Sequence, residues 1–186
     1  MSKDWAIVTG ASSGIGLEFS TIFAHKQVNV ALVSRNVNAL NSLANTLRTN
    51  GVKVLVIPLD LSVMEQVKDL VKVLDKKKII PRYLINNAGF GDFGYFTETK
   101  WEKEEKMLDL NIKALTYLTK VYAKVMKIEG RGAIVNVASG AAFQPGPLMA
   151  VYFATKAYVL HFSEAVAEEL SGTGVTITTL CPGPTQ

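Results

Sequence analysis

The sequence predicts an α/β fold in which a doubly wound parallel sheet lies between two layers of helices. Six short apolar runs are spread along the chain, and each of the first five precedes a stretch with apolar residues at helical spacing. The runs are continuous and do not alternate with polar residues, which is typical of strands buried on both faces of a parallel sheet. Right-handed crossovers then give a Rossmann-type, three-layer αβα sheet with ligand sites at the carboxyl ends of the strands.

The whole chain, residues 1–186, is expected to form one domain. Its 186 residues, of which 48% are hydrophobic, are enough for one large core and too few for two domains. Gly51 ends the second helix. Strands are expected at residues 5–8, 28–33, 52–59, 83–85, 133–138 and 175–181. One apolar face marks each helix: Ile15, Phe19, Ile22 and Phe23; Leu40, Leu43, Ala44 and Leu47; Val67, Leu70, Val71 and Leu74; Met107, Leu110, Ala114, Leu118, Val121 and Val125; Val159, Phe162, Ser163, Val166 and Leu170.

Three glycines connect the first strand to the first helix, in the segment from Thr9 to Gly16. A strand that turns through glycines into a helix directs backbone N–H groups and the positive helix end at one point, which makes an anion site. In a βα unit the usual anion is the pyrophosphate of a dinucleotide. We assign Gly10 to the tight turn, Gly14 to close approach of the phosphates and Gly16 to helix–strand packing. A glycine-rich turn that binds nothing is the alternative.

The spacing Gly-x-x-x-Gly-x-Gly, opened by threonine, resembles the nucleotide loop of the short-chain dehydrogenase/reductase family. The other motifs of that family follow in its order: Asn86-Asn87-Ala88-Gly89, Asn111, Ser139, Tyr152-x-x-x-Lys156 and Pro182-Gly183-Pro184-Thr185. The resemblance covers essentially the whole chain. It implies an oxidoreductase that interconverts a carbonyl and a secondary alcohol with a nicotinamide cofactor. An NADPH-binding sensor or regulatory protein without turnover is the alternative.

Ser34-Arg35-Asn36 stands directly after the second strand, where a site that prefers NAD usually carries an acid for the ribose 2′-hydroxyl. Ser34 does not repel a phosphate, and the guanidinium of Arg35 can pair with one in a forked geometry. We therefore expect NADP(H) to be preferred over NAD(H), with a further hydroxyl from Ser13. An ordinary surface arginine is the alternative.

Further cofactor contacts are implied by the resemblance. Asp60 is expected at the adenine, although it could instead cap the helix that begins near Ser62. The Asn86–Gly89 and Pro182-Gly183 segments are expected beside the ribose and nicotinamide, and plain turns are the alternative for both. The full expected set is Gly10, Ser12, Ser13, Gly14, Ile15, Gly16, Arg35, Asp60, Leu61, Asn87, Ala88, Gly89, Tyr152, Lys156, Pro182 and Gly183.

Tyr152 and Lys156 are four residues apart and therefore share one face of a helix. A phenol with a pKa of about 10 is a poor acid or base at neutral pH, and a nearby ammonium and nicotinamide cation both lower that pKa. The resemblance implies that Ser139 holds the substrate oxygen, Tyr152 gives it a proton, Lys156 binds the ribose and Asn111 holds a water of the proton relay. A hydrogen bond to the backbone is the alternative for the amide of Asn111.

Composition excludes several classes of function. Twenty Lys and Arg against 16 Asp and Glu give a net charge of only +4, and Lys76-Lys77-Lys78 ends a helix, so no nucleic-acid binding is expected. Cys181 is the only cysteine, which excludes an internal disulfide and favours an inert core thiol in a reducing compartment. No apolar run reaches the roughly 18 residues of a membrane span, and no signal peptide precedes the first strand. We expect a cytoplasmic protein without a metal site or membrane partner.

The substrate and the assembly are less defined by the sequence. An apolar pocket for a medium-sized ketone, aldehyde or 3-oxoacyl group is suggested by residues that flank the site in sequence, namely Phe90, Phe93, Tyr95, Phe96, Phe143 and Met149. Several of these could instead be core residues. The resemblance implies a homodimer or homotetramer through helices near residues 101–128 and 152–170. Family members normally continue past the Pro-Gly segment through a substrate-covering lid, a further helix and a last strand, which this sequence, ending at Gln186, does not contain. We expect a natural protein that continues through this tail; a natively short protein, with the sixth strand as an open edge, is the alternative.

Overall fold

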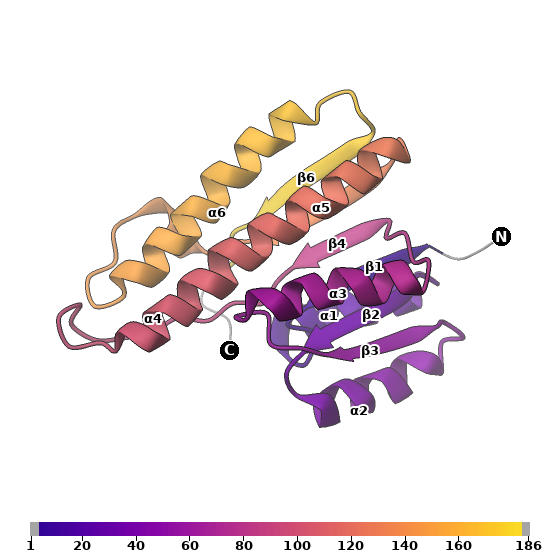
Figure 1. Cartoon of the computed structure of the whole chain (residues 1–186), viewed down its shortest axis with the longest axis horizontal. Coiled ribbons are helices and arrows are strands. Elements are labelled where there is room, and N and C mark those ends of the chain that lie inside the picture. Colours follow the sequence, from indigo (N-terminus) through magenta and orange to yellow (C-terminus); the bar gives the residue numbers. More distant parts are fainter. Residues whose placement is uncertain (1–3, 184–186) are drawn as a thin grey trace.

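The computed structural model describes residues 4–183 and confirms the three-layer fold (Figure 1). One parallel sheet has the strand order β3-β2-β1-β4-β5-β6. Its strands are β1 (Trp5–Thr9), β2 (Asn29–Ser34), β3 (Val54–Pro58), β4 (Tyr83–Asn86), β5 (Gly132–Val137) and β6 (Val175–Leu180). The helices are α1 (Gly14–His25), α2 (Val37–Arg48), α3 (Met64–Lys76), α4 (Trp101–Leu108), α5 (Leu115–Ile128) and α6 (Ala150–Glu169), with a π-helix η1 (Asp109–Ala114) and a 3₁₀ helix η2 (Gly140–Phe143).

Each face of the sheet has its own apolar core, because successive side chains of a strand point to opposite faces. On one face Ile7 and Leu84 pack with α3 and α5, and on the other Val8 and Ile85 pack with α1 and α2. A smaller cluster joins α5 to α6 beside the carboxyl end of β5. Strands β1, β2 and β4 are therefore covered on both faces, as their continuous apolar runs predict, whereas the outer strand β6 exposes Thr176 and Thr178.

The strand order reverses direction at β1, which pairs with β2 on one side and with β4 on the other. The loops that leave β1 and β4 therefore diverge to opposite sides of the sheet. Such a switch point opens a crevice at the carboxyl ends of the strands, where α/β proteins bind ligands.

The face of α1 that meets the sheet is only partly the predicted one, because Phe19 and Phe23 pack against the core as predicted but Ile22 does not. Gly16, Ser20 and Ala24 are its buried residues, whereas Ile22 is 49% exposed. The cause is the close approach of the helix to the first loop, since a Cβ on Gly16 would overlap the carbonyl oxygen of Gly10. Only small side chains fit at that distance, so the large apolar ones lie at the margins.

The predicted long helix over residues 101–128 is continuous but not α-helical throughout. It changes to π-helical geometry at η1 and returns to α-helix at Leu115. A π-segment within a helix shifts the side chains that follow it, and such segments are frequent at functional sites. Asn111 lies in η1 and is buried.

The remaining features concern surfaces. Strand β6 is the outer strand, and within residues 4–183 no strand pairs with its far edge. Helix α3 ends at Lys76, and Lys76, Lys77 and Lys78 are exposed as expected. None of the helices in the described part of the chain is both long and apolar enough to cross a membrane. Between residues 4 and 183 we find no cluster of three or more His, Cys, Asp and Glu side chains that could hold a metal.

Candidate active site

The glycine loop adopts a backbone that requires glycine at two positions. Gly10 has a φ of +64° and Gly14 a φ of +52°, both in the left-handed region. A Cβ on Gly10 would lie 2.7 Å from Nδ2 of Asn87, whereas a Cβ on Gly14 would meet nothing within 4 Å. Gly10 and Gly16 therefore make the loop compact, and Gly14 leaves its outer side open.

Two side chains join this loop to the end of β4. The Oγ1 of Thr9 accepts hydrogen bonds from the backbone N–H groups of Asn87 and Ala88, at 2.9 and 3.0 Å, and donates one to the carbonyl of Ile85. Nδ2 of Asn87 donates in return to the carbonyls of Thr9 and Gly10, at 3.0 and 3.3 Å. Asn87 thus fixes the loop with its side chain, and the backbone at Ala88 and Gly89 is held beside the crevice.

A cavity of about 550 Å³ opens above the glycine loop and extends past β2 and β3. Most of the expected cofactor residues line it, but Gly14, Gly16, Tyr152, Lys156, Pro182 and Gly183 do not. The lining residues from the expected set are Gly10, Ser12, Ser13, Ile15, Arg35, Asp60, Leu61, Asn87, Ala88 and Gly89. All the expected residues of the amino-terminal half except Gly14 and Gly16 therefore lie around one groove.

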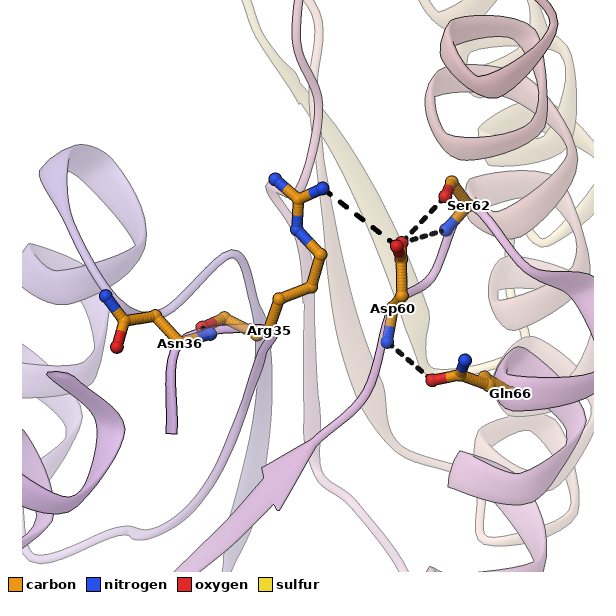
Figure 2. A network of polar contacts seen from close by, with 6 residues as sticks. Arg35, Asn36, Asp60, Ser62 and Gln66 are labelled. Atoms are coloured by element: carbon orange, nitrogen blue, oxygen red, sulfur yellow. Dashed lines mark hydrogen bonds and ion pairs between the residues drawn. The ribbon is translucent and has the colours of Figure 1, made fainter. Parts of the chain in front are cut away.

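Arg35 and Asp60 face each other across this groove (Figure 2). Nη1 of Arg35 lies 3.9 Å from Oδ2 of Asp60, and the Arg35 side chain is 75% exposed. Oδ1 of Asp60 accepts hydrogen bonds from the N–H and the hydroxyl of Ser62, at 2.9 and 2.7 Å. Burial alone would raise the pKa of Asp60, but these hydrogen bonds and the charge of Arg35 outweigh it and lower the pKa. The carboxylate is therefore fixed, whereas Arg35 is free to turn toward a ligand.

Asp60 does not cap the following helix. The N-cap residue of α3 is Val63, which makes no side-chain cap bond. The carboxylate of Asp60 instead closes the short turn that leads to Ser62, and its own N–H donates to Oε1 of Gln66 at 2.7 Å. Because α3 begins only after Val63, Asp60 is not its N-cap residue. Asp60 lines the groove, which is compatible with the expected contact to the adenine.

A second cavity, of about 730 Å³, adjoins the first and shares Ile15, Asn87, Gly89 and Phe90 with it. It lies at the carboxyl ends of β5 and β6 and is lined from both strand ends and from α6. The expected residues in its lining are Ser139, Tyr152, Lys156, Pro182 and Gly183. The structure describes Pro182 and Gly183 of the last motif, and Pro184 and Thr185 lie outside the described residues.

Tyr152 and Lys156 point into this cavity from one face of α6. Nζ of Lys156 lies 5.7 Å from the centre of the Tyr152 ring and donates a hydrogen bond of 2.9 Å to the carbonyl of Val137. Lys156 is only 6% exposed, and this burial lowers the pKa of its amine to about 8. A buried amine beside a phenol in a cleft is typical of proton-transfer sites.

Ser139 lies at the end of β5 and begins η2. Its Oγ accepts a hydrogen bond of 3.1 Å from the N–H of Ala141. A hydroxyl has one donor and two acceptor positions, so the O–H of Ser139 remains available to a ligand oxygen. Cys181 follows β6, is half-buried, and has its pKa raised by burial, as an inert core thiol would.

Asn111 does not line the second cavity. Its Nδ2 donates to the carbonyl of Phe90 at 2.9 Å and to Oγ1 of Thr155 at 3.1 Å, and its Oδ1 accepts from the N–H of Phe90 at 3.2 Å. Its amide therefore bonds to the backbone, the alternative considered above. The same Oδ1 faces Gly89, where an added Cβ would lie 3.0 Å from it and 3.5 Å from Nζ of Lys156.

Several residues that support the site could not be identified by spacing. Thr9 and Thr155 position Asn87 and Asn111 through their hydroxyls, as described above. A buried chain also runs beneath the site, in which Nδ2 of Asn86 donates to Asn136, and Nδ2 of Asn136 donates to Ser163 of α6. The only signal for these residues was a polar side chain within an otherwise apolar strand or helix face.

The comparisons with known proteins all point to one family. The profile of a family described as short chain dehydrogenase matches residues 4–186. An uncharacterised oxidoreductase of Staphylococcus aureus (strain MRSA252) is 33% identical over 178 residues, which is 96% of this chain and 76% of that protein. The bulky-bulky ketone specific alcohol dehydrogenase from Comamonas testosteroni superposes with a TM-score of 0.94 at 33% identity, over 100% of this chain and 74% of that one. A short-chain dehydrogenase from Sphingobium yanoikuyae in complex with NADPH has a TM-score of 0.92 at 35% identity, covering 98% and 72%.

Proposed function

The chain belongs to the short-chain dehydrogenase/reductase family of oxidoreductases, and from this premise we propose that it interconverts a carbonyl compound and a secondary alcohol with NADP(H). The observation that carries the proposal is the second cavity. There Tyr152, Lys156 and Ser139 line the same cavity, which adjoins the groove of the glycine loop. A phenol, an ammonium and a hydroxyl that line one cavity are the groups that carbonyl reduction needs.

A dinucleotide fits the residues of the adjoining groove. The loop at Gly14 has no neighbour within 4 Å on its outer side, and the start of α1 directs its N–H groups there. The far end of the groove holds the exposed guanidinium of Arg35. When bound, the cofactor supplies the hydride, and the protein supplies binding and orientation.

The preference for NADP(H) is supported by the charge at the end of β2. Arg35 is the cation that can pair with a 2′-phosphate, and Ser34 leaves room for it. The ion pair of Arg35 with Asp60 is long and exposed, so releasing the guanidinium costs little, about 0–1 kcal/mol. The short-chain dehydrogenase from Sphingobium yanoikuyae was solved in complex with NADPH, and a xylitol dehydrogenase of the same fold was solved with NAD⁺ bound, so the proposed preference rests on Arg35.

In reduction, Tyr152 acts as the general acid. The O–H of Ser139 donates to the carbonyl oxygen, which orients the substrate and stabilises the charge that develops there. The phenol of Tyr152 then transfers its proton to that oxygen as the alkoxide forms, and the phenolate left behind faces the ammonium of Lys156. Since the pKa of Lys156 is about 8, its amine is mostly protonated at pH 7 and carries a positive charge over the ring of Tyr152.

Asn111 is proposed to act next to Lys156. Both N–H donors of its amide are used, by Phe90 and Thr155, but Oδ1 retains one acceptor position. That oxygen and Nζ of Lys156 both face Gly89. We propose that a water held between them passes a proton from the solvent toward Lys156 and Tyr152, and so replaces the proton that Tyr152 has given to the product.

The outer faces of the long helices support a homodimer or homotetramer. Trp101 of α4 is 60% exposed, Ile128 of α5 is 77% exposed, and Tyr158 of α6 is 38% exposed. Large apolar side chains on adjacent helices are typical of surfaces that pack against a second copy. The mass of the protein in solution, measured by light scattering, tests this assembly.

The reaction is tested by following NADPH oxidation in the presence of a panel of ketones and aldehydes, with the alcohol product identified by chromatography. We expect one alcohol formed for each NADPH consumed, and slower turnover with NADH at the same concentration. Binding of NADPH without reduction of any carbonyl would contradict the proposed activity.

A further inference from the structure

The backbone of Gly91 lies against the ring of Tyr152 and has no role in the mechanism above. A Cβ on Gly91 would lie 3.1 Å from Cδ2 and 3.2 Å from Cγ of Tyr152, and 3.2 Å from Cε of Met149. The φ of Gly91 lies outside the left-handed region, so the backbone conformation does not require glycine here. The missing side chain instead lets the backbone approach the ring closely.

The segment that carries Gly91 is fixed on both sides of that residue. Before it, the N–H and the carbonyl of Phe90 are both bonded to the side chain of Asn111, at 3.2 and 2.9 Å. After it, the N–H of Gly94 donates a hydrogen bond of 2.8 Å to the carbonyl of Leu148. Gly91 is therefore held in place relative to η1 and to the segment that leads into α6.

The ring of Tyr152, in contrast, has space into which it can turn. It borders the second cavity and also a recess of about 30 Å³, which Met149 lines together with residues of α4 and of the loop before it. At the distances given above, an added Cβ requires its neighbour to move by a few tenths of an ångström. The segment could yield only by breaking its hydrogen bonds, whereas the ring need only rotate from its rotamer, so the ring is the part that moves.

A small movement at the base of this ring changes the position of the phenol oxygen. Cγ and Cδ2 lie at the base of the ring and the hydroxyl lies at its far end, so a rotation about the Cα–Cβ bond displaces the hydroxyl farther than the base. Proton transfer needs that hydroxyl within hydrogen-bond reach of the substrate oxygen. A misplacement of about 1 Å can lower a reaction rate about 10²-fold. The contact with Gly91 is therefore expected to affect turnover.

We propose that Gly91 is a positioning residue, whose backbone holds the ring of Tyr152 in the orientation that proton transfer requires. This inference rests on the proposed function and adds a residue to its site. It also gives the amide of Asn111 a second task. By fixing the backbone of Phe90, Asn111 acts on Tyr152 through the contact at Gly91, in addition to the water relay described above.

Two variants of graded size test the contact. Gly91→Ala is expected to lower kcat for ketone reduction about tenfold and Gly91→Val about 10²-fold, with KM for the ketone and the Kd of NADPH changed less than about twofold. Thr97→Ala, at an exposed residue of the same loop, is the control and should keep the kcat of the wild type. An unchanged kcat in both Gly91 variants would overturn the inference. So would a raised KM with an unchanged kcat, because the added side chain would then crowd the substrate and not Tyr152.

The position of the ring is also measured without turnover. In protein labelled with 3-fluorotyrosine, the ¹⁹F resonance of Tyr152 is assigned among those of the six tyrosines by its loss in Tyr152→Phe. We expect Gly91→Ala to shift this resonance and to leave unchanged that of Tyr122, which is 2% exposed and reports on the core. An unmoved Tyr152 resonance, or a shift of both, would overturn the inference. If the wild type reduces no carbonyl, the proposed function fails, and the resonance of Tyr152 still decides whether Gly91 positions the ring.

Discussion

Replacing Lys156 by methionine is expected to stabilise the protein at neutral pH while removing its activity. The amine is only 6% exposed, and burial lowers its pKa to about 8 from the ordinary 10.5. At about 1.4 kcal/mol per pH unit, burial of the ammonium form therefore costs about 3 kcal/mol of folding free energy. The variant also loses the hydrogen bond to the carbonyl of Val137, which lowers its stability by about 1 kcal/mol. The net gain at pH 7 is about 2 kcal/mol, or about 4–8 °C in Tm for a domain of this size.

The difference in stability between the wild type and Lys156→Met is expected to depend on pH. Below about pH 8 the lysine is protonated in both the folded and the unfolded state, and the burial cost is fully present. Between about pH 8 and 10.5 the unfolded state binds a proton that the folded state does not, so the stability of the wild type rises with pH relative to the variant. The advantage of Lys156→Met, about 2 kcal/mol at pH 7, should therefore disappear between about pH 9 and 10, and near pH 10.5 the variant should be less stable than the wild type by about the 1 kcal/mol of the lost hydrogen bond.

Urea unfolding followed by circular dichroism at pH 7, 9 and 10.5 measures this difference. Lys120→Met, at an exposed lysine of α5, is the matched control and should show no such pH dependence. A Lys156→Met variant that is less stable than the wild type at pH 7, or whose advantage grows with pH, would refute the reasoning. The lysine is thus expected to be retained for its chemistry at a cost in stability.

Three further predictions concern the cofactor groove and the π-helical segment. Arg35→Ala should lower the ratio of NADPH affinity to NADH affinity at least about tenfold, because a charge-assisted pair with the 2′-phosphate contributes about 1.5–3 kcal/mol. Fluorescence titration measures both affinities, and Arg48→Ala is the control that should leave the ratio unchanged. Gly16→Ala should destabilise the fold by about 1–3 kcal/mol or more, seen as a lower urea midpoint, because its Cβ overlaps the Gly10 carbonyl. Thr155→Val should leave a buried amide N–H unpaired, lowering stability by about 1–3 kcal/mol and kcat with it, and an unchanged urea midpoint would contradict this.

The sequence predicted the fold because burial on both faces leaves a clear pattern in the strands. Continuous apolar runs such as residues 30–33 occur only where both faces are covered, and the intervening helices follow from their spacing. The strand ends in the structure differ from the predicted ones by one or two residues, because a strand ends where its hydrogen bonds to the neighbouring strand end, and hydropathy does not report those bonds. The inner face of α1 was predicted only in part: Phe19 and Phe23 pack against the core, but Gly16, Ser20 and Ala24 are the fully buried residues. Gly16 sets the distance between the helix and the glycine loop, and the periodicity of apolar residues gives no information about that distance.

The candidate site was predicted as a set of residues, but its internal bonds were not. The groove and the second cavity bring together the glycine loop, Ser139, Tyr152 and Lys156, which lie far apart in the chain. The hydroxyls of Thr9 and Thr155 are common residue types whose partners come from distant segments, so no local pattern identifies them. The π-helical turn at Asn111 likewise depends on bonds to Phe90 and Thr155 that form only in the folded chain.

Replacement of Tyr152 by phenylalanine tests the central claim most directly. The account predicts that Tyr152→Phe lowers kcat for ketone reduction at least about 10²-fold, the usual contribution of a general acid, while NADPH still binds. Tyr158→Phe is the matched control, because it removes a hydroxyl from the same helix. The hydroxyl of Tyr158 lies 3.0 Å from Oγ1 of Thr116, and Tyr158 does not line the second cavity, so this variant should keep full turnover. Full turnover by Tyr152→Phe with NADPH bound would contradict the account.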